Sequence, residues 1–190
     1  MKKALSTLAV TLALFSSVSF AADNYTLDSN FSSVSFATIK KQYIVEPATI
    51  NTLSGTLDSN GQFTVSVDLN GIETGVAIRN TRLNDIFFES AKHSPVTVTG
   101  KVDWASLGEG SHKMNVPAEV TLFGNTKSIE FPVFILNAGD TVMVSSSAPV
   151  IIGAADFGIP SKNLTDLAAT VGDIGISDRV PLNLNLTFKK

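Results

Sequence analysis

The histidines are the first side chains to test for chemistry, because imidazole is the commonest metal ligand and proton carrier in proteins. The sequence has two of them, His93 and His112. Neither has a second histidine at the spacing of a metal site, and there is no cysteine to complete one. The lack of cysteine also excludes thiolate nucleophiles and haem attachment. Both histidines are therefore interpreted as surface residues, and no metal or other cofactor is expected.

Two carboxylates form the next candidate site. Asp85 and Glu89 are four residues apart in a segment with helical periodicity, so both point the same way. Such a pair can hydrolyse a glycosidic bond, although a solvated helix face has the same pattern and is the favoured interpretation. The sequence has no Gly-x-Ser-x-Gly or Ser-x-x-Lys motif for a serine nucleophile. We therefore expect a protein that is not an enzyme, and the alternative is a hydrolase that uses the carboxylate pair.

Two arginines are the cations most suited to holding a ligand. Arg79 and Arg82 stand near the start of the same helical segment, a few residues before a pair of phenylalanines. A planar guanidinium group matches the geometry of phosphate, which makes either arginine a candidate for contacting a polar or phosphorylated head group. The alternative for Arg79 is a structural ion pair, for example with Asp85 or Asp28.

The elements that must position these residues are mainly β-strands. Apolar and polar residues alternate in five segments, which predicts strands with one apolar and one solvated face. These segments are 63–69, 96–104, 116–122, 129–135 and 180–188. Weaker strands are expected over 25–27, 34–39, 50–57, 141–145 and 150–153. So many antiparallel strands must either close into a barrel or stack as a sandwich to hide their edges, and alternation alone does not choose between the two.

One segment breaks the alternation. The apolar residues of 80–92 have a spacing close to that of a helix, and Ser94-Pro95 should end it. They are Leu83, Ile86, Phe87 and Ala91. A second irregular stretch, 156–176, is expected to hold a short helix around 164–169. No linker or low-complexity block divides the sequence, so one domain is expected.

The first 21 residues have the layout of a secretory signal peptide. Met1-Lys2-Lys3 is basic, residues 4–18 are apolar, and Ser19-Phe20-Ala21 places small residues before a cleavage site. The apolar run is shorter than the roughly 20 residues of a spanning helix. A domain over 22–190, exported to the periplasm without stable membrane insertion, is therefore expected. Without the two lysines the net charge falls from −3 to −5, which makes nucleic acid an unsuitable partner.

A set of spaced motifs extends over essentially the whole mature chain. In chain order these are Tyr25-Thr26-Leu27-Asp28, Val34-Ser35-Phe36, Arg79-Asn80-Thr81-Arg82-Leu83, Phe87-Phe88, Lys92-His93-Ser94-Pro95, Glu119-Val120-Thr121-Leu122-Phe123-Gly124-Asn125-Thr126-Lys127, Asp156-Phe157-Gly158-Ile159 and the strand 180–188. Together they resemble the YceI-like family of periplasmic polyisoprenoid-binding proteins. Three places depart from the family pattern: Asn80 stands where the family prefers aspartate, Phe123 where it often has histidine, and His93-Ser94 where tyrosine is common.

The resemblance implies an all-β fold, an eight-stranded antiparallel lipocalin-like barrel with a short helix after the mid-chain arginine motif. It also implies a binding protein that carries or sequesters a long-chain isoprenoid quinone or prenyl phosphate inside the barrel. A ligand-free structural β-sandwich remains an alternative beside the hydrolase. The residues expected to bind the lipid are Phe36, Phe63, Val65, Val67, Arg79, Arg82, Leu83, Phe87, Phe88, Val98, Val120, Leu122, Val133, Leu182 and Leu184. The arginines should meet the head group, and the aromatic side chains should cover the hydrocarbon at the entrance.

Overall fold

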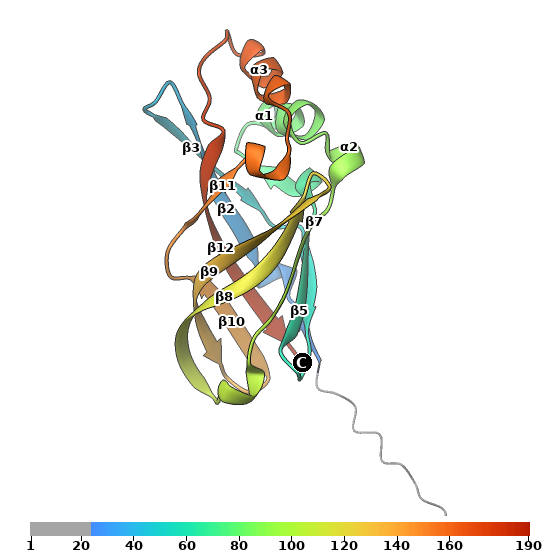
Figure 1. The fold of residues 1–190 in the computed structure, drawn as a ribbon, viewed down its shortest axis with the longest axis vertical. Helices are drawn as coiled ribbons and strands as arrows, with labels where there is room; N and C mark the ends of the chain where they lie inside the picture. The colour runs from blue at the N-terminus through green and yellow to red at the C-terminus, as the bar shows by residue number, and fades with distance from the viewer. Residues whose placement is uncertain (1–23) are drawn as a thin grey trace, which may run out of the picture.

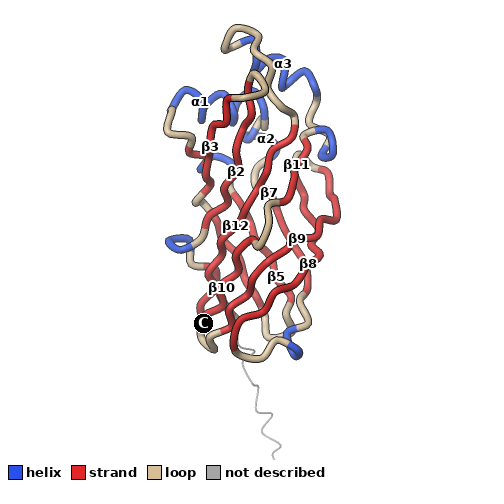
Figure 2. Tube along the Cα trace, turned by 90° about the vertical axis from the view of Figure 1, so that its left-hand side faces the viewer, coloured by secondary structure: helices blue, strands red, loops and turns tan. Residues whose placement is uncertain are grey.

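The structure is a computed structural model that describes residues 24–190. The expected signal peptide, residues 1–21, lies outside the described residues. The strands are β1 (Tyr25–Leu27), β2 (Ser33–Lys40), β3 (Ile44–Ile50), β4 (Leu53–Leu57), β5 (Gln62–Val67), β6 (Ile72–Glu73), β7 (Val96–Lys101), β8 (Gly110–Leu122), β9 (Asn125–Asn137), β10 (Thr141–Ser146), β11 (Val150–Gly153) and β12 (Arg179–Lys189). They form one antiparallel sheet that wraps around a common interior (Figure 1, Figure 2).

Eight of these strands close into a ring, as predicted. The order is β1, β4, β5, β7, β8, β9, β10 and β12, and β12 returns to β1 by pairing Phe188 with Leu27. Because each strand of a closed ring pairs on both sides, these eight strands leave no edge with unpaired backbone groups along these pairings. The sandwich alternative from the sequence is therefore wrong.

The remaining strands lengthen the wall toward one end. The C-terminal half of β12 lies between β1 and β10, whereas its N-terminal half lies between β2 and β11. Thus β1 and β2 follow one another along one side of β12, with the short 3-10 turn η1 (Ser29–Phe31) between them. In the same way β3 extends β4 beside β2, and β6 extends β5 beside β3.

The register of the ring keeps the apolar half of each strand inside. Val98 on β7 lies opposite Val65 on β5 and Val120 on β8, so these three form one interior layer. Val133 on β9 is only 1% exposed, and the buried hydrophobic residues form a single cluster along the interior. The alternation in the sequence therefore predicted correctly which face of each of these strands is buried.

Helices gather at one end of the barrel (Figure 1). They are α1 (Ala77–Arg82), the π-helical turn η3 (Leu83–Phe87), α2 (Ser90–His93) and α3 (Ser161–Ala169), and the other 3-10 turns are η2 (Leu69–Gly71), η4 (Trp104–Ser106) and η5 (Ala155–Phe157). Within residues 24–190, no helix has the length and apolar character needed to cross a membrane.

The helical segment expected at 80–92 is present but is built differently. It begins earlier, at Ala77, and it is interrupted at Glu89, whose φ of 46° lies in the left-handed region. The helix ends at His93, directly before Ser94-Pro95, as predicted. The short helix expected near 164–169 is α3, which starts three residues sooner at Ser161.

The main difference lies in β3, which the sequence did not predict. A single strand was expected over 50–57, but β4 covers only its second half and β3 precedes it. The strand was not predicted because Glu46 and Pro47, a charged residue and a proline, interrupt the apolar pattern of β3. Proline is tolerated there because β3 pairs with β6 only at Thr49 and Ile50, which leaves its outer part as a sheet edge.

Candidate functional site

The interior of the barrel holds a cavity of about 230 Å³. Its lining comes from all eight strands of the ring except β1, from β2, β3 and β11, and from the turns and helices at both ends. The polar residues in this lining are Thr38, Ser177 and Asp178; the others are hydrophobic. An apolar cavity of about 150 Å³ already stays dry and takes up small hydrocarbons, so this larger one favours an apolar ligand over water.

Thirteen of the fifteen residues expected at the site line this cavity. They are Phe36, Phe63, Val65, Val67, Leu83, Phe87, Phe88, Val98, Val120, Leu122, Val133, Leu182 and Leu184. Their inward orientation follows from strand alternation and from the apolar face of the helical segment. Their role in ligand binding stays a prediction.

Several lining residues were not identified from the sequence. Val142 and Val144 on β10 alternate like the others, so the signal was present but short. Phe157, Ile159 and Leu167 come from the irregular stretch before and within α3. Phe157 is 1% exposed, yet nothing in the local periodicity distinguishes it, because its burial depends on where the loop folds back.

Phe87 and Phe88 both reach the cavity because of the π-helical turn. In η3 the N–H of Phe88 donates to the carbonyl of Leu83, five residues earlier, at 2.9 Å. The two rings then meet edge to face, with centroids 4.8 Å apart. The buried amide of Asn163 on α3 donates to the carbonyl of Phe87 at 3.0 Å, which ties the two helical segments together over the end of the barrel. A π-turn at such a place is a common feature of functional sites.

The two predicted arginines do not line the main cavity; they line a second, smaller hollow beside it. This vestibule is bounded by the β2–β3 hairpin, α1 and α3. Its lining consists of Thr38, Lys40, Val76, Ile78, Arg79, Arg82, Leu83, Leu167, Thr170, Val171 and Ile176. Four of these residues, Thr38, Leu83, Leu167 and Ile176, also line the main cavity. The vestibule therefore adjoins the apolar interior at the helical end of the barrel.

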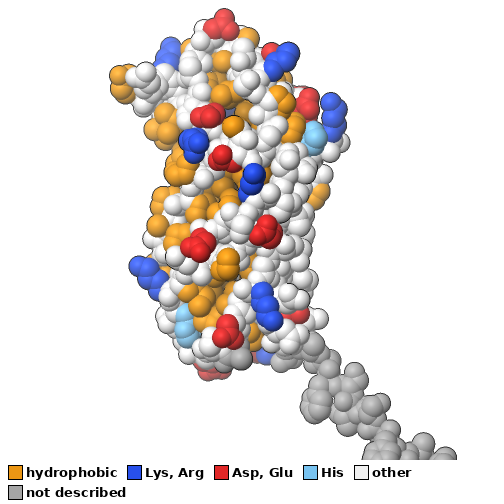
Figure 3. Space-filling model, in the orientation of Figure 1, with side chains coloured by type: hydrophobic (Ala, Val, Ile, Leu, Met, Phe, Trp, Pro, Cys, Tyr) orange, Lys and Arg blue, Asp and Glu red, His pale blue; other side chains and the backbone are white. Residues whose placement is uncertain are grey.

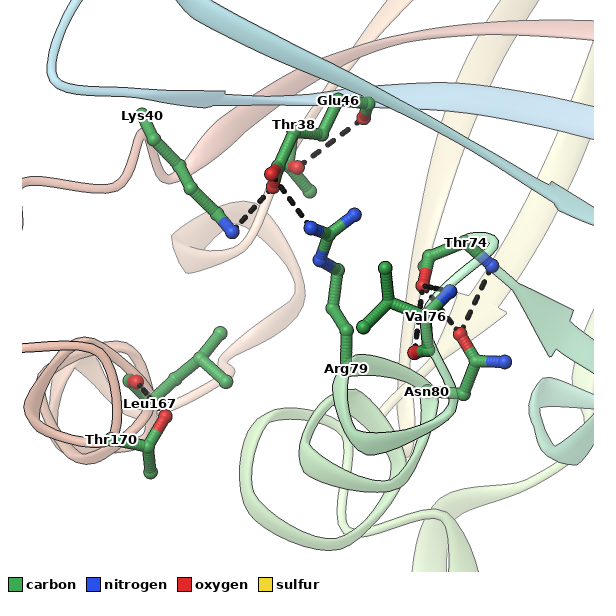
Figure 4. Close-up of polar contacts among 9 residues, drawn as sticks. All are labelled: Thr38, Lys40, Glu46, Thr74, Val76, Arg79, Asn80, Leu167 and Thr170. Atoms are coloured by element: carbon green, nitrogen blue, oxygen red, sulfur yellow. Dashed lines mark hydrogen bonds and ion pairs between the residues drawn. The ribbon is translucent and has the colours of Figure 1, made fainter.

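Glu46 pairs with two of the three cations that line the vestibule, Lys40 and Arg79 (Figure 4). Its carboxylate accepts from Arg79, with 2.7 Å between Nη2 and Oε1, and its other oxygen pairs with Lys40. The ion pair expected for Arg79 is thus present, but neither partner proposed from the sequence, Asp85 or Asp28, forms it. Glu46 was missed because it belongs to the strand that the sequence concealed.

Asp28 instead forms an ion pair with Lys189 at the opposite end of the barrel. Its Oδ2 lies 2.7 Å from Nζ of Lys189, and its Oδ1 accepts from the backbone N–H of Asn30. The hydrogen bond from Lys189 is the main reason why the pKa of Asp28 is held below its ordinary value. This pair therefore belongs to the closure of β1 against β12.

None of the three places that depart from the family pattern, Asn80, Phe123 and His93-Ser94, lines either hollow. Asn80 accepts from the backbone N–H and the hydroxyl of Thr74, at 3.0 and 2.6 Å, and so fixes the turn that leads into α1. Phe123 occupies the β8–β9 turn with a φ of 52°, and its ring lies against His93, with centroids 3.8 Å apart. Both residues hold local structure at the helical end.

The carboxylates near the helices form ion pairs or accept hydrogen bonds outside the cavity. Glu89 faces Lys92 at 3.6 Å and His93 at 3.7 Å, and neither Glu89 nor Asp85 lines the cavity. The backbone N–H of Gly75 is the main cause that lowers the pKa of Glu73. Within residues 24–190 there is no group of three or more side chains arranged to hold a metal ion.

The pKa of Asp68 is lowered mainly by the backbone N–H of Asn70, which donates at 3.0 Å. The hydroxyl of Ser94 adds a second hydrogen bond, also 3.0 Å long, and thereby connects η2 to the end of α2. This carboxylate therefore links the turn before β6 to the residue that follows α2.

The chain is similar to known proteins in both sequence and structure. The sequence profile of the YceI-like domain matches residues 25–188. A solved polyisoprenoid-binding domain from Saccharophagus degradans, implicated in plant cell wall breakdown, superposes with a TM-score of 0.81. It is 30% identical over 87% of this chain and 97% of its own. BcnA of Burkholderia cenocepacia has a TM-score of 0.65 at 16% identity, over 85% of this chain and 98% of its own, which shows a likeness of fold. No curated protein matches the sequence.

Proposed function

We propose, since this chain belongs to the YceI-like domain family, that it binds a long-chain polyisoprenoid lipid inside its barrel and performs no chemistry on it. The observation that carries this proposal is the lining of the cavity, in which the three polar residues are Thr38, Ser177 and Asp178. The similarity to the polyisoprenoid-binding domain of Saccharophagus degradans supports the same class of ligand. The protein would act as a carrier or store of this lipid.

The apolar lining is sufficient to hold such a ligand without directional contacts. Burial of each methylene group contributes about 0.8 kcal/mol, whereas association costs roughly 4–15 kcal/mol. A few buried isoprene units therefore offset the cost, and each further unit strengthens binding until the tail fills the barrel. Affinity should thus depend more on tail length than on head-group chemistry.

The vestibule is the natural place for the head group, because it adjoins the cavity and carries cations. Arg79 is already engaged by Glu46, whereas Arg82 has no ion-pair partner among the described residues. Arg82 is therefore the better candidate for meeting a polar or phosphorylated group. An isoprenoid quinone or a prenyl phosphate would place its head here and its tail between the strands.

The expected signal peptide supports a carrier that works in the periplasm. In that compartment a long isoprenoid cannot cross water freely, and a barrel that covers the tail would keep it dispersed. The alternative hydrolase finds less support, because Glu89 is paired with Lys92 and both candidate carboxylates lie outside the cavity lining.

The test is mass spectrometry of lipids extracted from the protein after gentle purification from its own periplasm. The expected result is a long-chain prenyl species in near-stoichiometric amount. The matched control is a Val98→Glu, Val133→Glu variant, which puts two charges into the interior layer and should lose the lipid; circular dichroism would verify that it folds. If the unaltered protein carries no lipid and also fails to take up prenyl alcohol after delipidation, the proposal is wrong.

A further inference from the structure

Large hydrophobic side chains are exposed to an unusual degree at the helical end of the barrel. Within residues 24–190, ten large hydrophobic residues are well exposed, and five of them lie at this end. These five are Tyr43, Ile44, Val45, Val76 and Ile78. Tyr43 is 84% exposed, the largest fraction of the ten. Exposed apolar side chains that gather at one end of a molecule are typical of a surface that is covered in use.

The five residues come from two segments that the ion pair between Glu46 and Arg79 joins. Tyr43, Ile44 and Val45 lie at the tip of the β2–β3 hairpin, which projects from the helical end of the barrel (Figure 1). Figure 3 shows hydrophobic side chains on this projection. Val76 and Ile78 flank the start of α1 and line the vestibule. The register of the hairpin sets Ile44 opposite Lys40, another vestibule residue, and the ion pair between Glu46 and Arg79 fastens the hairpin to α1. We call these five residues the apolar rim.

Cations without acidic partners accompany the rim. Lys41 is adjacent to the hairpin tip, and Arg82 lines the vestibule together with Ile78. Neither has an ion-pair partner within the described part of the chain, although the protein as a whole has a net charge of −3. Acidic residues also occur around this end, including Glu73 and Asp173, so the electrostatic contribution is secondary to the apolar one.

We propose that the apolar rim is a docking surface for the lipid bilayer, which brings the mouth of the cavity against the membrane when cargo is exchanged. This inference rests on the proposed function, because an isoprenoid must leave a bilayer to enter the barrel. Apolar side chains would enter the acyl boundary, and the tyrosine at the tip would lie at the headgroup level, where its ring and its hydroxyl are both accommodated. Lys41 and Arg82 would face anionic headgroups.

The shape of the rim favours a bilayer over a protein partner. A projecting hairpin tip with two flanking cations presents a convex surface, which suits insertion into a fluid interface. The exposed side chains on the outer wall differ in this respect: Phe134, Leu136 and Met143 are neighbours across the paired strands β9 and β10. They lie on the sheet face away from the mouth, so they provide a matched control with similar chemistry.

The experiment measures cosedimentation of the full mature protein with sucrose-loaded vesicles of phosphatidylethanolamine and phosphatidylglycerol. The rim variant is Tyr43→Ser, Val45→Thr, and the control is Phe134→Ser, Met143→Thr. We expect the bound-to-free ratio to fall at least tenfold for the rim variant and to stay within twofold for the control, because two large apolar side chains no longer leave water. Lys41→Gln should lower binding roughly fivefold on anionic vesicles and leave it unchanged on neutral ones.

A second assay keeps the inference distinct from the proposed function. Prenyl alcohol delivered from cyclodextrin, without vesicles, should bind the rim variant and the unaltered protein equally, since Tyr43 and Val45 do not line the cavity. Equal vesicle binding by rim and control variants would overturn the docking surface while leaving ligand binding intact. Loss of self-association in the rim variant, without any change in vesicle binding, would identify a second copy as the occupant and also overturn it. Failure of the cyclodextrin assay in every variant would instead count against the proposed function.

Discussion

The guanidinium group of Arg79 on α1 lies 2.7 Å from the carboxylate of Glu46 on β3, and this contact joins the helical insertion to the hairpin at the helical end of the barrel. Both side chains are about a quarter exposed, at 24% and 22%. The pair has two consequences: it holds the wall of the vestibule in place, and it occupies one of the two arginines that the sequence offered for a head group.

Replacing Glu46 with glutamine should therefore make the vestibule more selective for anionic lipids. Arg79 and Lys40 would lose their carboxylate partner, and an additional unpaired charge a few ångströms from a phosphate contributes about 1 kcal/mol in a solvated site. We expect prenyl phosphate to bind roughly fivefold tighter relative to prenyl alcohol. Isothermal titration at low and high salt measures the ratio, which should shrink as salt rises. Glu130→Gln on the outer wall is the control, and a ratio that changes as much in that variant would contradict the placement.

The Arg82→Glu variant tests the head-group contact directly. Reversing the charge should weaken prenyl phosphate binding more than binding of the matching alcohol, since only the phosphate is repelled. Phe87→Asp should weaken both ligands, because it places a carboxylate in the apolar lining. Binding to delipidated protein at two salt concentrations separates the effects. Equal losses for phosphate and alcohol in Arg82→Glu would remove Arg82 from the site.

Trp104 should report how deep the lipid tail reaches. It is the one tryptophan in the sequence, it lines the cavity, and it packs edge to face on Tyr25 with ring centroids 5.7 Å apart. Its turn connects β7 to β8 at the end of the barrel away from the helices (Figure 1). A long prenyl alcohol should shift the emission of Trp104 to the blue, while a short one held near the mouth should not. Trp104→Phe should abolish the signal. Identical spectra for short and long ligands would contradict a placement in which the head group lies in the vestibule and the tail extends toward Trp104.

Gly100 is expected to be essential for the width of the interior. It lies opposite Phe63, whose ring covers the place where a side chain would be. A Cβ atom at this position would lie 2.4 Å from Cζ of Phe63 and 2.8 Å from the carbonyl oxygen of Pro117. Gly100→Ala should therefore lower the free energy of unfolding by about 1–3 kcal/mol, as overpacking does, and weaken ligand binding by displacing the ring.

Urea denaturation measures the stability of this variant. Gly108→Ala is the matched control, because a Cβ at that position would meet nothing within 4 Å. If the two variants are equally stable, the close approach of Phe63 to Gly100 does not constrain the barrel.

The inward side of each strand could be predicted from the local alternation of apolar and polar residues. Strict alternation has a period of two, the same as the pleat of a strand, so Val65, Val98 and Val120 could be assigned to the interior without knowing which strands pair. Turn chemistry was equally local: the carboxylate of Asp58 accepts from two backbone N–H groups, and Gly61 supplies a φ of 80°. These features depend on residues close together in the chain.

Closure of the ring and the arrangement of residues at its helical end depend on contacts between distant segments. Closure depends on Leu27 meeting Phe188, which no local pattern encodes. Strand β3 is stabilised by its partner β2 and not by its own composition, so Glu46 stayed hidden and the partner of Arg79 could not be identified. The same holds for Phe157, which is buried because a loop folds over the cavity. These features could not be predicted locally, because a contact between distant segments forms only where the fold brings the second segment next to the first.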